Sequence, residues 1–113
     1  MTLREVSSLL NASICLEQEG TSPEISHAFA SDLMSEVLAI NETPLLLTGL
    51  CNIQTIRTCE MAGLNVVVFV RDKQPTAEMI ELARENDIAI LCSPYSLFKA
   101  SGILYANGVL PLF

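Results

Sequence analysis

The chain has 113 residues, half of them hydrophobic, which suits one globular domain spanning 1–113 and excludes a disordered chain. No apolar run reaches the roughly 18 residues of a membrane span, and the N-terminus has no signal-peptide pattern, so we expect a cytoplasmic protein away from the membrane. The net charge of -7, from 13 acidic against 6 basic residues, repels phosphate backbones and disfavours nucleic-acid binding.

The first 40 residues predict short, loosely patterned elements. Thr2 and Glu5 form a capping-box pattern for a helix over residues 3–10. A strand over 13–16, a polar loop over 17–23 and a strand over 25–29 follow. Ser31 and Asp32 then offer caps for a helix over 33–40.

The remainder predicts alternating buried strands and amphipathic helices. Strands are expected at 45–47, 65–70 and 88–91, with one helix from the cap Asn52 to Gly63 and a second from 74–75 to 86–87. A last helix, capped by Ser93 and Pro94, runs to about Ala106 and precedes a short apolar tail over 109–113. The pattern predicts a three-layer α/β/α domain with a mostly parallel sheet of 4-5 strands.

Ligands of open parallel sheets bind beyond the carboxyl ends of the strands, where three loops lie in this sequence. Each loop precedes the N-terminus of a helix, where free backbone amides favour anions. The first loop has one glycine and lacks the known phosphate-binding patterns, so a tight turn is the alternative interpretation. The candidate ligand-binding residues are Thr48, Gly49, Cys51, Asn52, Arg71, Lys73 and Ser93.

No catalytic or metal-binding pattern stands out. Four cysteines at positions 15, 51, 59 and 92 lack the close pairs of a zinc site, which favours reduced, mostly buried thiols. Cys51 precedes a predicted helix N-terminus, a place that lowers the pKa of a thiol. Its partnership with His27 as a catalytic dyad, or with His27, Asp32 and Cys92 as a metal site, depends on the fold.

Several segments of the chain resemble small stand-alone DRTGG-domain proteins. The segment at 30–39 is similar to their "SDLLSDVMA" stretch, 52–59 to their helix start, and 88–98 to their final strand and helix. Residues 3–20 also resemble the opening of the N-terminal domain of HPr kinase/phosphorylase. This resemblance implies a three-layer α/β/α fold and a regulatory or dimer-forming module. Such modules also occur attached to phosphotransacetylase-type enzymes and CBS-containing pyrophosphatases.

The name-giving Asp-Arg-Thr-Gly-Gly signature of that family is absent. Gly49, Leu50 and Cys51 are the nearest counterpart to its Gly-Asp-Arg part, with both charged residues replaced, and residues 71–73 stand in place of its Thr-Gly-Gly-like turn. The resemblance therefore does not imply that this chain binds a ligand through those polar groups.

We expect a non-catalytic regulatory or ligand-sensing module, and no cofactor is identified. It would act as a homodimer, or dock on a larger enzyme system of the redox or hydrogenase type, and a small anionic ligand such as a nucleotide would suit it. The alternatives are a small transferase-type enzyme using the loop at 49–52, and a redox or metal sensor using Cys51 and Cys92.

Overall fold

The computed structural model describes residues 1–18, 20 and 23–113, and its centre is one six-stranded sheet. The strands lie in the order β1-β5-β4-β3-β2-β6. All neighbours are parallel except β1 and β5, which are antiparallel. The strands are β1 (Ser13–Leu16), β2 (His27–Ala30), β3 (Leu45–Thr48), β4 (Val66–Phe69), β5 (Ala89–Cys92) and β6 (Leu110–Pro111).

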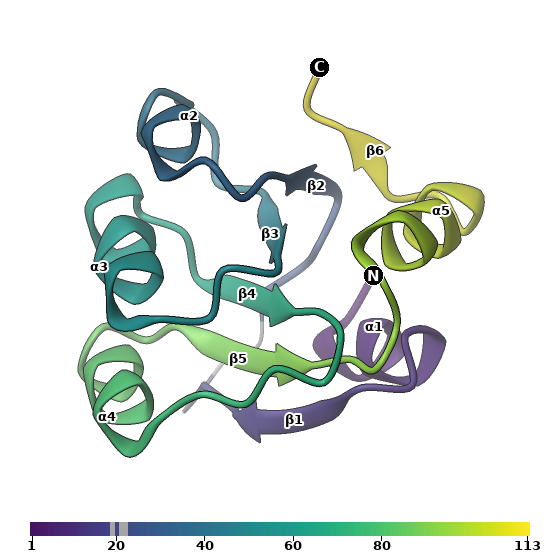
Figure 1. Cartoon of the computed structure of the whole chain (residues 1–113). Coiled ribbons are helices and arrows are strands. Elements are labelled where there is room, and N and C mark those ends of the chain that lie inside the picture. The colour runs from purple at the N-terminus through teal and green to yellow at the C-terminus, as the bar shows by residue number, and fades with distance from the viewer. Residues whose placement is uncertain (19, 21–22) are drawn as a thin grey trace.

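Helices cover both faces of this sheet, which confirms the predicted three-layer α/β/α class. In Figure 1, α2, α3 and α4 lie on one side of the sheet, and α1 and α5 lie on the other. Their bounds are α1 (Leu3–Leu9), α2 (Met34–Leu38), α3 (Ile53–Ala62), α4 (Ala77–Glu85) and α5 (Leu97–Ala106). None of the described helices is long and apolar enough to cross a membrane.

Two apolar cores form because β3, β4 and β5 are buried along their whole lengths. Side chains of successive strand residues point to opposite faces. Val68 therefore packs in the core under α1 and α5, whereas Val67 packs in the core under α3 and α4. This double burial explains why these strands read as unbroken apolar runs in the sequence.

Several predicted helix boundaries are confirmed, two starts by their capping hydrogen bonds and one end by its backbone conformation. Thr2 and Glu5 form a complete capping box at α1. Asn52 accepts the backbone N–H of Thr55 at the start of α3, and Gly63 ends that helix with a φ of 74°, a left-handed conformation that glycine adopts without steric cost.

Three predicted helix starts are wrong, and in each case side-chain bonding gives the reason. Helix α5 begins after Ser96, because the hydroxyl of Ser93 is buried and bonded elsewhere. Helix α4 begins after Thr76, whose hydroxyl accepts the backbone N–H of Met79. Asp32 does not cap α2, because its carboxylate bonds to the end of β3.

The predicted apolar tail contains a sixth strand, one more than the sheet was expected to hold. In β6, Leu110 pairs with His27 and Pro111 pairs with Ala28, beside β2 at the edge of the sheet. The sequence signal for a two-residue strand containing proline is weak.

The second strand also lies slightly later than predicted. Within the predicted loop 17–23, residues 19 and 21–22 lie outside the described residues.

Candidate functional site

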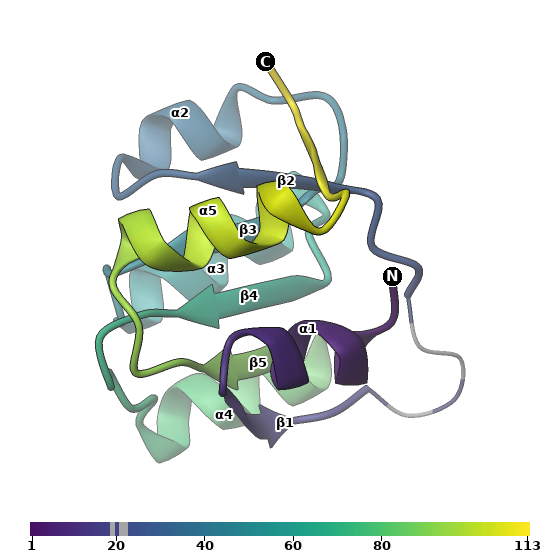
Figure 2. The same cartoon turned by 90° about the vertical axis from the view of Figure 1, so that its right-hand side faces the viewer.

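The carboxyl ends of the parallel strands lie together at one edge of the sheet, as predicted, and the loops after β3, β4 and β5 all begin there. Figure 2 shows this edge on the left, where the strand arrows of β2, β4 and β5 point. The candidate ligand-binding residues come from these three loops, except Thr48, which is the last residue of β3.

The loop after β3 is held by a carboxylate of the same chain. The Oδ1 atom of Asp32 accepts the hydroxyl of Thr48 and the backbone N–H of Gly49, each at 2.8 Å. The Thr48 hydroxyl oxygen in turn accepts the backbone N–H of Leu50 at 3.1 Å. Asp32 thus occupies the donors that an external anion would use at Thr48 and Gly49. The missing signal in the sequence was the pairing of β2 with β3, which brings Asp32 to this loop.

Two more candidates have structural partners. Asn52 caps α3 by accepting the N–H of Thr55 at 3.0 Å. Ser93 is fully buried; it donates its hydroxyl to the carbonyl of Leu10 at 2.7 Å and accepts the N–H of Tyr95 at 3.2 Å. Ser93 therefore joins the end of α1 to the loop after β5.

Arg71 and Lys73 are exposed, in the loop after β4. The backbone of this loop is fixed: the N–H of Arg71 donates to the carbonyl of Tyr95 at 2.8 Å, and the N–H of Asp72 donates to that of Ser93 at 3.0 Å. Arg71 and Asp72 have φ angles of 59° and 58°, in the left-handed region that non-glycine residues enter rarely. These backbone bonds fix the points from which the two exposed cationic side chains leave the backbone.

The thiol of Cys51 is half-buried, and its environment differs from the sequence expectation. Burial raises the pKa of Cys51, and the lowering of that pKa by the nearby charge of Lys73 is a smaller effect. The predicted decrease in pKa is therefore wrong. A thiol that stays protonated at neutral pH is a weak nucleophile, so the transferase alternative lacks an activated group here.

His27 lies far from Cys51 along the sheet. It opens β2 and shares a hydrogen bond of 2.9 Å with the hydroxyl of Ser26, whereas Cys51 follows the carboxyl end of β3. Because β2 and β3 are parallel, the two residues sit at opposite ends of strands about 13 Å long. The structure does not bring the dyad together. Within the described residues, no group of three or more His, Cys, Asp or Glu side chains is arranged to hold a metal ion.

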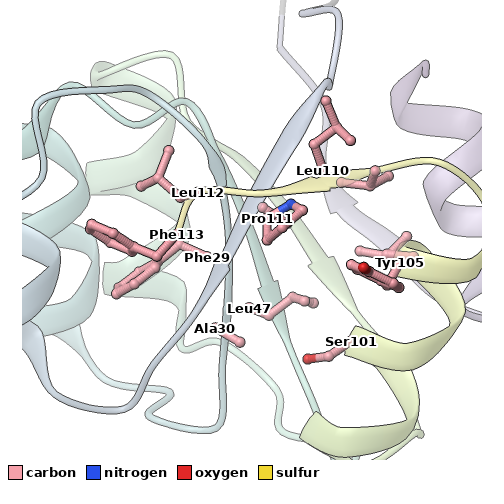
Figure 3. A pocket seen from close by; sticks show the side chains of 12 residues that line it. Phe29, Ala30, Leu47, Ser101, Tyr105, Leu110, Pro111, Leu112 and Phe113 are labelled. Atoms are coloured by element: carbon pink, nitrogen blue, oxygen red, sulfur yellow. The ribbon is translucent and has the colours of Figure 1, made fainter.

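A second feature is an apolar groove of about 250 Å³ between β2, β6 and α5. Figure 3 shows its side chains, with Phe29 and Phe113 on one side and Ser101 and Tyr105 on the other. The rings of Phe29 and Phe113 meet edge to face with centroids 5.9 Å apart. The lining residues are Ala28, Phe29, Ala30, Leu47, Ser101, Leu104, Tyr105, Val109, Leu110, Pro111, Leu112 and Phe113.

Comparison with known protein families finds no match, and comparison with curated proteins finds none either. Among solved structures, the chain is similar to the CBS and DRTGG domains of the regulatory region of Clostridium perfringens pyrophosphatase, determined with its activator, diadenosine tetraphosphate. The TM-score is 0.77 at 20% sequence identity, over 98% of this chain and 48% of that chain. The likeness shows a shared fold, and this chain spans about half the length of that structure.

Proposed function

We propose that this chain is a non-catalytic regulatory module of the DRTGG type that senses a small anionic ligand such as a nucleotide. The observation that carries the proposal is the similarity of its whole fold to about half of a regulatory region that was determined with a nucleotide activator. The resemblance of three of its segments to DRTGG-domain proteins supports the same assignment.

The charge distribution favours the corner after β4 as the point where an anion would bind. The chain has a net charge of -7 and six basic residues, yet Arg71 and Lys73 are placed two positions apart in one rigid loop. An arginine and a lysine together attract a phosphate group strongly, because hydrogen bonds between ionised groups are stronger than neutral ones. Thr48 and Gly49 would not donate to this anion, because the carboxylate of Asp32 already accepts their hydrogen bonds.

Thermal unfolding with and without ligand tests this proposal. Diadenosine tetraphosphate, ATP and AMP would each be added to the intact protein, with inorganic phosphate as a comparison. A ligand at about 100 times its Kd stabilises by roughly 2.7 kcal/mol, which raises the unfolding midpoint by about 10 °C in a domain of this size. The double variant Arg71→Ala, Lys73→Ala should lose this rise.

Arg84→Ala is the matched control, since it removes one exposed cation from the far end of α4, where Arg84 pairs with Glu81 at 2.8 Å. This variant should keep the full response to the ligand. The proposal fails if none of the nucleotides changes the midpoint, or if Arg84→Ala loses the response as completely as the double variant does.

We further propose that two copies of the module associate through α5 and the C-terminal residues. Several large apolar side chains there face solvent: Phe98 is 90% exposed, Phe113 is 89% exposed, and Tyr105 and Leu110 are more than half exposed. Isolated exposed apolar residues are ordinary, but four of them on α5 and the segment that follows it favour an interface. A larger enzyme would be the alternative partner for this surface.

A further inference from the structure

Two cysteines that lie far apart in the sequence meet at one end of the sheet. The sulfur atoms of Cys15 in β1 and Cys92 in β5 are 2.7 Å apart, and both thiols are free in this structure. Cys51 is close enough for its charge to act on the pKa of Cys92. A redox role is expected from the sequence for Cys51 and Cys92 but not for Cys15, because the partner of Cys15 is decided only by the pairing of β1 with β5.

The alternation of side chains along β1 places the two thiols on the same face of the sheet. Ser13 pairs with Cys92, and Cys15 lies two residues after Ser13, so its side chain points to the face of Cys92. A bulge follows at this point, since Ile14 pairs with Leu91 and Leu16 pairs with Ile90, which leaves Cys15 unpaired between them. Cys15 consequently packs against the core under α3 and α4, to which Cys92 also belongs.

We propose that Cys15 and Cys92 are a redox-modification site that closes into a reversible disulfide between β1 and β5. The oxidant is a small disulfide such as oxidised glutathione. The Cys15 thiolate, on a half-buried residue, attacks one glutathione sulfur, forming a mixed disulfide and releasing one glutathione thiolate. The sulfur of Cys92, after losing its proton to solvent, then attacks the Cys15 sulfur and releases the second glutathione. Two protein thiols are oxidised and one glutathione disulfide is reduced.

The two cysteines differ in exposure in a way that suits this order of steps. Cys92 is only 4% exposed, and burial together with the hydrogen bond to Cys15 raises the pKa of Cys92 far above its usual value. A buried, protonated thiol is a poor first attacker, but it is already in contact with the sulfur that it must reach in the second step. The closed form would join positions 77 residues apart and hold the edge strand β1 to the sheet.

The test is to equilibrate the intact, reduced protein with mixtures of reduced and oxidised glutathione, quench it in acid, and alkylate the remaining thiols. Trypsin alone leaves Cys15 and Cys51 in one peptide, residues 5–57, so a glutamate-specific protease is added. The expected product is a cross-linked pair of peptides, 6–17 with 86–99, lighter than the sum of the reduced peptides by about 2 Da. The oxidised protein should unfold at a temperature about 10 °C higher than the reduced protein, because the bridge restricts the unfolded chain.

Cys15→Ser should abolish the cross-link and the rise in unfolding temperature, whereas Cys51→Ser, the matched control, should retain both. The proposal is overturned if the folded protein keeps four free thiols in oxidised glutathione while the urea-unfolded protein loses them. It is equally overturned if the cross-linked peptides contain Cys51, or if glutathione stays attached to Cys15 as the final product.

Discussion

The Oδ1 atom of Asp32 accepts a hydrogen bond from the hydroxyl of Thr48 at 2.8 Å, so the loop after β2 is tied to the end of β3. Thr48 is fully buried, and the carboxylate is the acceptor of its hydroxyl. The same carboxylate oxygen also accepts the N–H of Gly49. One side chain therefore holds together the first loop of the candidate ligand site.

Asp32→Ala is expected to lower the free energy of unfolding by about 1–2 kcal/mol, since it leaves a buried hydroxyl without its acceptor. Asp32→Asn keeps an acceptor oxygen and should lose less. Glu42→Ala removes an exposed acid elsewhere and should change stability by less than about 0.5 kcal/mol. Urea unfolding of the three variants measures these differences. An equal loss in Asp32→Ala and Glu42→Ala would show that the bond to Thr48 is unimportant.

Val68→Asp should unfold the domain. Val68 is fully buried in β4, where a carboxylate would have neither water nor a cation beside it. Val68→Ala, which only removes two carbon atoms from the same place, should cost about 2–3 kcal/mol and leave a folded protein. Circular dichroism and urea unfolding distinguish the two. A soluble Val68→Asp protein that unfolds cooperatively would contradict the position of β4 in the sheet.

The stability of the domain should fall at alkaline pH partly through Cys59. Burial raises the pKa of Cys59 from 9.0 to about 12. The folded state therefore holds this proton more tightly than the unfolded state, so the stabilisation is complete below pH 9 and is lost as the pH rises toward 12. The full effect is up to about 4 kcal/mol.

Urea unfolding between pH 8 and pH 10.5 measures this dependence, and Cys59→Ala should show a smaller decrease over that range. The variant loses some stability at every pH because a buried side chain is shortened, so the slope is the informative quantity. Identical slopes in the two proteins would mean that the Cys59 thiol titrates as freely as it does in an unfolded chain.

Self-association through α5 predicts that light scattering on the intact protein will show a dimer at micromolar concentration. Phe98→Ser together with Phe113→Ser should shift the mass toward the monomer, because both side chains are about 90% exposed and contribute apolar contact area. Met61→Ser on α3 is the matched control: Met61 is exposed too, but it lies on the opposite side of the sheet. A strict monomer in the unmodified protein would rule out this interface.

The sequence predicted the parts of the fold that depend on neighbouring residues. The buried strands β3 to β5 follow from continuous apolar runs, and the starts of α1 and α3 follow from their capping side chains. The predictions failed where distant segments compete for the same groups. Asp32 has a side chain that could cap a helix, but its carboxylate instead accepts the hydrogen bond of the buried Thr48 hydroxyl.

The location of the candidate ligand site could be predicted from the sequence, but the bonding partners of its residues could not. The loops gather at one edge because the strands are parallel, and that rule needs only their order. The partners of Ser93 and Cys15 depend on which strand borders β5, and the sequence contains no local signal for that choice. Cys51 shows the same limit, since burial by neighbouring elements determines the pKa of its thiol.

The position of β1 at the edge of the sheet has a consequence for the order of folding. Leu47 pairs with Val68 and Val68 pairs with Leu91, so β3, β4 and β5 join through short crossovers. Ser13, in contrast, pairs with Cys92, which closes a far longer loop at greater entropic cost. We therefore expect β3, β4 and β5 to assemble first and β1 to dock last. In native-state hydrogen exchange, the amides of β1 should open more often than those of β4.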